Sequence, residues 1–169
     1  ALTTQNDRNY PTTVYHYAFD GVDTWTYNYR EDYIYNSAQQ TTHVSYLSYL
    51  GPNKWNLYRQ ENITYAADSV SPTLHETQDI ADSVVTFTGL TEYTYDDHFN
   101  MTSELNGSFY DSDTAVTYSQ MYSYVYDNDD RIVDATTAYW YPEGGYWDIQ
   151  YRSSYEYDEN GNQVRYSYY

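Results

Sequence analysis

Along most of the chain, aromatic or β-branched residues alternate with polar residues, which is the pattern of a β-strand with one covered face. Stepping by two from Trp25 reaches Tyr27, Tyr29, Tyr33 and Tyr35, and most of the intervening residues are polar. The same step runs from residue 116 to 126 and from residue 147 to 157. Each segment therefore predicts a long strand whose aromatic face is buried.

The strands belong to a repeat. An aromatic pair followed by a turn residue recurs along the chain, with a weaker copy at residues 63–65. The second aromatic residue of each copy, at positions 35, 65, 95, 126 and 157, follows that of the previous copy by 30, 30, 31 and 31 residues. A period of this length is typical of arrays built from one supersecondary unit. We predict a single β-repeat domain over residues 1–169, with an N-terminal strand at 12–19 and repeat units at 25–54, 55–84, 85–115, 116–146 and 147–169.

A second strand is predicted after each turn, at residues 42–50, 101–110, 131–141 and 164–169. Residues 70–80 are the exception, because Pro72 and poor alternation predict a loop or an interrupted edge strand. Short connections predict an all-β fold, an antiparallel up-and-down meander of about ten or eleven strands, curved or closed into a barrel. A two-layer β-sandwich is the alternative fold.

Composition adds to this picture and excludes several classes of protein. The 27 tyrosines and 4 tryptophans can supply the core that aliphatic residues usually form. The 25 acidic and 7 basic residues give a net charge of -18, which argues against nucleic acid as a partner. No apolar run is long enough for a membrane-spanning helix, and the absence of cysteine excludes disulfides and thiolate metal sites.

No nucleotide, phosphate or cofactor motif occurs, so no cofactor is expected. Glu31 and Glu61 are the candidate catalytic residues, together with Arg59, because they interrupt the aromatic face at equivalent positions. Two strands apart they would lie about 10 Å from each other, near the upper limit for an inverting carboxylate pair. An ion pair, or a solvent-exposed part of that face, explains the same residues.

Two further groups of residues are candidate binding sites. Tyr139, Trp140 and Tyr141 offer flat faces for sugar rings, although cross-strand aromatic packing is the favoured explanation of these residues. Asp127, Asp129 and Asp130 are candidate ligands for a weakly bound calcium ion, although ordinary turn chemistry also explains acidic residues there.

Around the turns the sequence reads YTYDDHFNMTSEL, YVYDNDDRIVDAT and YEYDENGNQVRYS. These segments resemble the tyrosine-aspartate (YD) repeats of bacterial rearrangement-hotspot and toxin-complex shell proteins. The resemblance implies β-hairpins in which Tyr-Asp pairs have a packing role. The chain departs from that family in having five units where shells have many, and in lacking the frequent Gly-Arg after the aspartate, except as the looser Asp130-Arg131.

The composition is also similar to that of small tyrosine-rich secreted proteins of gut Bacteroidetes. Ser69, Ser83 and Thr114 lie in Asp-(Ser/Thr)-apolar triplets that resemble the O-glycosylation sites of exported proteins in those bacteria, and ordinary loop residues are the alternative. Both resemblances imply a secreted, periplasmic or cell-surface protein whose signal peptide has been removed.

Together these observations predict a non-enzymatic, exported binding or structural module of the bacterial surface or periplasm. A glycan, or another surface protein, is the expected partner, with carbohydrate as the candidate ligand. The alternatives are a glycan-acting hydrolase that uses Glu31 and Glu61, and a fragment of a larger YD-repeat shell.

Overall fold

The computed structural model describes residues 2–5, 10–19, 21–67, 70–110, 112–113 and 115–169, and this part of the chain contains twelve β-strands and no helix. The strands are β1 (Leu2–Gln5), β2 (Pro11–Phe19), β3 (Trp25–Tyr35), β4 (Thr41–Gly51), β5 (Lys54–Tyr65), β6 (Pro72–Ala81), β7 (Val84–Tyr95), β8 (Met101–Tyr110), β9 (Thr117–Tyr126), β10 (Ile132–Tyr141), β11 (Tyr146–Tyr157) and β12 (Gln163–Tyr168).

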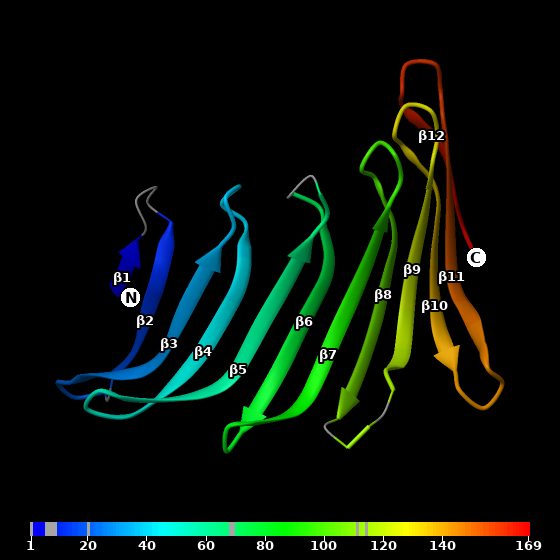
Figure 1. Ribbon diagram of the computed structural model, residues 1–169. Coiled ribbons are helices and arrows are strands. Elements are labelled where there is room, and N and C mark those ends of the chain that lie inside the picture. Colours follow the sequence, from blue (N-terminus) through cyan, green and yellow to red (C-terminus); the bar gives the residue numbers. More distant parts are fainter. Residues whose placement is uncertain (1, 6–9, 20, 68–69, 111, 114) are drawn as a thin grey trace. The chain divides into compact units, whose positions relative to one another are not determined.

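The strands pair in sequence order from β1 to β12, and each pair for which the register is given is antiparallel (Figure 1). The predicted all-β meander is therefore confirmed, with twelve strands in place of ten or eleven. All twelve belong to one sheet, whereas the alternative sandwich requires two. No helix long and apolar enough to cross a bilayer occurs in the described part of the chain.

The prediction of a loop or edge strand at residues 70–80 was wrong. β6 is a regular strand with β5 and β7 as its neighbours in the sheet. Pro72 is its first residue, where the missing N–H removes little from the ladder. The strand lacks clear alternation because polar side chains pair across it: the Gln60 side-chain amide donates to the Gln78 oxygen at 2.5 Å.

By contact density the chain divides into two compact units. The first contains Ala1–Gly89 with Tyr110–Ser112, and the second contains Leu90–Phe109 with Asp113–Tyr169. The hairpins β2–β3, β4–β5 and β5–β6 thus belong to the first unit, and β9–β10, β10–β11 and β11–β12 belong to the second.

A β-bulge at one position of the repeat changes the face on which the aromatic residues lie. In β3, Tyr29 pairs with His16 and Tyr27 pairs with Tyr17, so Asn28 is the extra residue. Because neighbouring residues of β2 face opposite sides, Tyr27 and Tyr29 also face opposite sides. The extra residue recurs three positions after the start of each unit whose register is described, at Asn28, Tyr58, Ser119 and Gln150.

The bulges correct the prediction of one continuous aromatic face, and the predicted aromatic core is also not observed. The buried hydrophobic residues among those described are Val44, Leu90 and Ala138. Trp25 is 66% exposed, and Trp55 is only half-buried, although both occupy the predicted place at the start of a strand. The rings pack in pairs on the sheet instead of filling an interior, as Trp140 and Trp147 do at 5.4 Å between centroids.

Candidate functional site

The turns that follow the aromatic pairs share one geometry, set by the Asp or Asn after the second tyrosine. Asp158 Oδ1 accepts hydrogen bonds from the main-chain N–H groups of Asn160 and Asn162, at 2.9 and 2.8 Å. The fourth residue of each turn has a positive φ, and it is glycine only in the last copy, Gly161. The same pair of side-chain acceptor bonds is made by Asn36, Asp96 and Asp127.

The second tyrosine of the motif fixes four of the hairpins to the neighbouring strand. Tyr157 donates its hydroxyl hydrogen to the main-chain oxygen of Ile132 at 2.9 Å, and Tyr126 does the same to Met101 at 2.9 Å. In the first unit Tyr35 donates to Pro11 and Tyr65 to Thr41. The Tyr-Asp pairs are therefore packing and turn-forming residues, which is the role that the resemblance to YD repeats implies.

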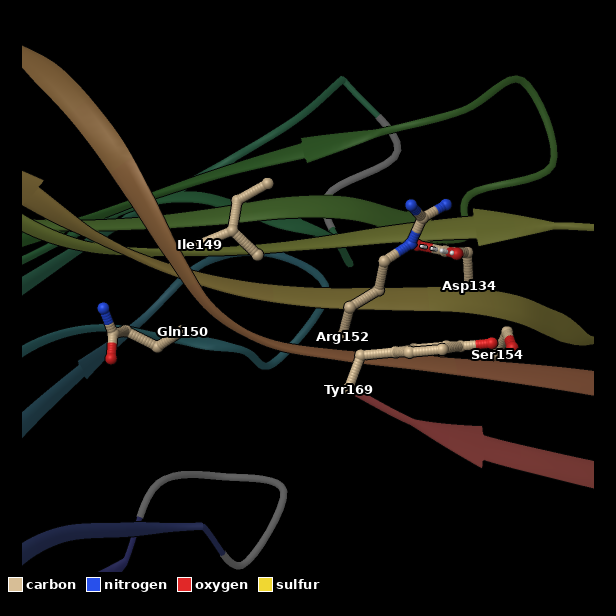
Figure 2. Close-up of a pocket in the computed structure, with 6 residues that line it drawn as sticks. All are labelled: Asp134, Ile149, Gln150, Arg152, Ser154 and Tyr169. Carbon is tan, nitrogen blue, oxygen red and sulfur yellow. Dashed lines mark hydrogen bonds and ion pairs between the residues drawn. The ribbon is translucent and has the colours of Figure 1, made fainter.

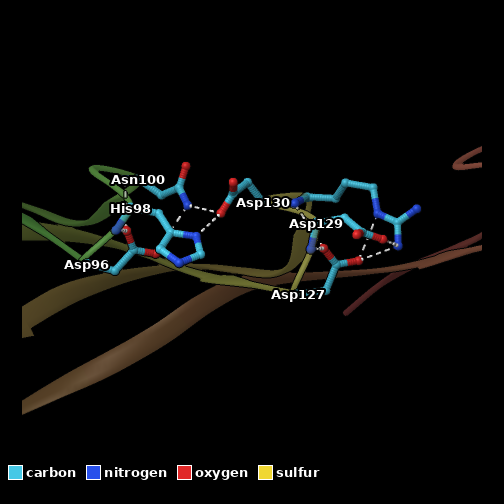
Figure 3. Close-up of polar contacts among 7 residues, drawn as sticks. Asp96, His98, Asn100, Asp127, Asp129 and Asp130 are labelled. Atoms are coloured by element: carbon cyan, nitrogen blue, oxygen red, sulfur yellow. Dashed lines mark hydrogen bonds and ion pairs between the residues drawn. The ribbon is translucent and has the colours of Figure 1, made fainter.

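Successive turns of the second unit contact each other through polar side chains (Figure 3). His98 Nδ1 lies 2.7 Å from Asp130 Oδ1, and the Asn100 side-chain amide donates to the same oxygen at 2.8 Å. The hydrogen bond to Asp130, followed by the charge of that carboxylate, raises the pKa of His98. The hydrogen bond from His98 correspondingly lowers the pKa of Asp130.

The candidate calcium ligands are already engaged. Arg131 bonds Asp127 through Nε at 2.8 Å and forms an ion pair with Asp129 at 2.9 Å, and Asp130 is held by His98. The hydrogen bond from Arg131 is the largest cause of the lowered pKa of Asp127. No group of three or more His, Asp or Glu side chains in the described part of the chain is arranged to hold a metal ion.

Glu31 and Glu61 lie on one face of the sheet, as predicted, since they pair with Tyr46 and Val44, two positions apart on β4. Tyr46 stands opposite Glu31 in the register and donates its hydroxyl hydrogen to Glu61 at 3.1 Å. Burial, and then the charge of Glu61, raises the pKa of Tyr46 to about 12.

Both carboxylates also have other partners. Glu61 lies 3.1 Å from His75 Nε2 and 4.0 Å from Arg59 Nε, while Glu31 accepts a hydrogen bond from the Tyr33 hydroxyl at 2.5 Å. Catalysis by Glu31 and Glu61 stays a prediction. The contacts of Glu61 with His75 and Arg59 fit the alternative, in which the carboxylate is part of an ion pair.

Tyr139, Trp140 and Tyr141 do not form a continuous platform, because successive residues of β10 face opposite sides of the sheet. Trp140 packs against Trp147, and Tyr141 packs against Tyr146 at 5.4 Å between ring centroids. Their contacts are those of cross-strand aromatic pairs, the alternative interpretation of this segment.

A pocket of about 520 Å³ on the second unit collects the side chains of Asp134, Ile149, Gln150, Arg152, Ser154 and Tyr169 (Figure 2). Asp134 and Ser154 face each other across β10 and β11, and Arg152 lies two residues before Ser154 on the same face. Arg152 Nε donates to Asp134 Oδ2 at 2.8 Å. The main chains of Arg152 and Tyr169 exchange hydrogen bonds of 2.9 and 3.2 Å, which places the Tyr169 ring beside the ion pair.

The pocket offers hydrogen-bond donors and acceptors around the Asp134–Arg152 ion pair, whose opposite charges cancel. The Asp134 side chain is 19% exposed and that of Arg152 is 59% exposed, so the guanidinium keeps donors available to a ligand. Gln150, the bulge residue of β11, points away from the ion pair (Figure 2). Its side-chain amide donates to Asp148. Tyr169 and Ile149 supply apolar surface, and Ser154 supplies a hydroxyl.

The sequence did not indicate this pocket, because Asp134, Gln150, Arg152 and Ser154 occupy polar positions of the alternating pattern and appear as an ordinary solvent face, whereas Ile149 belongs to the apolar positions. One signal was present: Arg152 occupies the place of Arg30 in the repeat, two residues after the bulge. Of the candidate glycosylation sites, Ser83 is exposed in the turn between β6 and β7, and Ser69 and Thr114 lie outside the described residues.

A scan against protein-family models and a search of curated proteins found no match to the sequence. Similar solved structures include a protein of unknown function from Bacteroides fragilis, with 8% identity, 73% of this chain and 88% of that chain covered, and a TM-score of 0.49. They also include the Tc holotoxin pore of Photorhabdus luminescens and a TcdB2–TccC3 structure, each with 16% identity and a TM-score of 0.46. The alignments cover 92% and 99% of this chain and 9% of each of those chains.

Proposed function

We propose that the protein is a non-enzymatic carbohydrate-binding module, in which a scaffold of YD-type hairpins presents the pocket around Asp134 and Arg152 to a neutral glycan. The observation that carries the proposal is the Asp134–Arg152 pair at 2.8 Å beside the Tyr169 ring. Sugar hydroxyls both donate and accept hydrogen bonds, and the less polar face of a sugar ring packs on aromatic rings. The pocket supplies all three kinds of contact.

A neutral glycan fits better than an acidic one. Asp134 compensates the charge of Arg152, and the chain carries a net charge of -18, which repels anions. Export to the bacterial surface or periplasm is part of the proposal, because a repeat-built acidic module without a catalytic motif suits an extracellular ligand. Cell fractionation of the producing organism tests the location separately.

The binding proposal is tested with an array of neutral and acidic glycans, followed by calorimetry on the neutral glycan that binds best. Arg152→Ala and Tyr169→Leu should each weaken binding by about tenfold or more, because each removes a direct contact. Tyr151→Leu is the matched control, since Tyr151 lies on the opposite face of β11 and stacks on Tyr168.

Binding that is lost in Arg152→Ala and Tyr169→Leu but kept in Tyr151→Leu would support the proposal. A full chain that binds no neutral glycan would overturn it. Equal loss in all three variants, with the fold intact by circular dichroism, would also overturn it, because the pocket would then have no special part in binding.

A further inference from the structure

A second pocket lies on the first unit, on the face of the sheet opposite Glu31 and Glu61. Its volume is about 320 Å³. Tyr15 pairs with Arg30, which pairs with Leu47, and Tyr49 follows Leu47 by two residues, so these side chains share that face. The described residues that line the pocket are Tyr15, Tyr27, Tyr49, Pro52, Asn53 and Trp55.

The four rings form inclined walls and not a flat platform. Tyr27 and Trp55 meet at 77° with centroids 5.7 Å apart, and Tyr49 and Trp55 meet at 61° with centroids 5.2 Å apart. Tyr15 lies 5.6 Å from Tyr27, at 61°. A flat sugar ring stacks best on one exposed face, whereas a rounded group can contact several inclined rings at once.

The electrostatics of these walls favour a cation. Aromatic ring faces carry negative potential, and no charged side chain is among the described residues lining the pocket. The net charge of -18 attracts cations to the surface as a whole. The same indole already attracts a cation of the chain itself, since the Arg30 guanidinium carbon lies 5.1 Å from the Trp55 ring centroid. The charge of Arg30 is balanced by an ion pair with Asp32, in which Arg30 Nη2 lies 2.7 Å from Asp32 Oδ2.

From this geometry we infer that the pocket of Tyr15, Tyr27, Tyr49 and Trp55 is a binding site for a quaternary ammonium group. The ligand class is a methylated ammonium compound such as choline, whose rounded cationic head presents methyl groups to the ring faces. This inference is independent of the glycan proposal, because the two pockets lie on different units and share no residue.

Choline and its neutral isostere 3,3-dimethylbutan-1-ol are the decisive pair of probes, since they match in shape and differ in charge. Affinity for the full chain is measured by calorimetry, and the NMR signal of the Trp55 indole N–H shows where the ligand binds in the wild-type chain. Choline should bind about tenfold more tightly than the isostere, the factor that a desolvated cation–π contact supplies. Phosphocholine as a third probe shows whether the site accepts the group with an anion attached or only as a free cation.

Trp55→Leu should abolish choline binding, and Trp147→Leu on the second unit should leave it unchanged. Trp55→Phe covers the case in which the leucine variant does not fold, because it keeps a ring with a weaker negative face and should weaken binding several-fold while the isostere binds as before. Equal affinity for choline and the isostere would overturn the inference, as would no binding of choline, or choline shifts at Trp147 in place of Trp55.

Discussion

Tyr157 and Ile132 are joined by a hydrogen bond from the tyrosine hydroxyl to the main-chain oxygen, at 2.9 Å across 25 residues of sequence. Ile132 is the first residue of β10, so the bond holds the beginning of one return strand to the end of the following strand. Tyr126 and Met101 have the same relationship, also across 25 residues. In both copies, therefore, the tyrosine of the motif lies 25 residues after the main-chain oxygen that it bonds on the neighbouring strand.

Tyr157→Phe should destabilise the second unit by about 1 kcal/mol, because it removes this bond and leaves the Ile132 oxygen without its side-chain donor. Urea denaturation followed by tryptophan fluorescence measures the change. Tyr155→Phe is the control: Tyr155 precedes it by two residues and packs its ring on Tyr166. If both variants lose the same free energy of unfolding, the hydrogen bond to Ile132 does not account for the loss in Tyr157→Phe.

Asp158→Ala should lower the urea midpoint, whereas Asp158→Asn should largely preserve it, because Asn36 makes the same turn in the first repeat with an amide oxygen. The hydrogen bonds from Asn162 and Asn160 lower the pKa of Asp158 below its ordinary value of 3.8. Its ionised form therefore stabilises the fold fully above 3.8, and this stabilisation is lost as the pH falls through the lowered pKa. The difference between wild type and Asp158→Ala should shrink in acid.

Local periodicity was sufficient to predict most strands. The alternation over residues 25–35 and 101–110 matches the bounds of β3 and β8, and the turn residues between strands were recognisable by type. The segment 70–80 was misassigned because the pairing that supports β6, such as Gln60 with Gln78, is polar and joins it to β5, so it leaves no apolar alternation within the segment itself.

The bulges could not be predicted from the sequence, because the extra residues have no side chain in common. Asn28, Tyr58, Ser119 and Gln150 are defined only by the register of the partner strand. Without the bulges, the sequence pattern assigns the aromatic residues to one face. That assignment conceals the pocket of aromatic rings on the first unit and the pocket around Asp134 and Arg152 on the second. Both pockets depend on which residues face the same side, a property that changes at each bulge.

His98→Gln should destabilise the second unit more at about pH 5.5 than at about pH 8.5. The hydrogen bond to Asp130, and the charges of Asp130, Asp96 and Asp97, raise the pKa of His98 above 6.5. The protonated ring therefore stabilises the fold fully below 6.5, and the effect is lost as the pH rises through the raised pKa. An NMR titration of His98 should show the raised pKa directly, and Asp130→Asn should return it toward 6.5.

Phe99→Gly should stabilise the second unit, by up to about 1 kcal/mol, although it removes a large apolar side chain. Phe99 occupies the fourth position of its turn with a φ of 66°, where Gly161 stands in the last repeat, and its side chain is 61% exposed. Relief of the left-handed conformation should exceed the added entropy of the unfolded chain. Asp97→Gly, in the same turn but without a positive φ, should instead destabilise. Calorimetric unfolding of both variants measures the contrast, and a lower melting temperature for Phe99→Gly would show that the exposed ring contributes more than the strain costs.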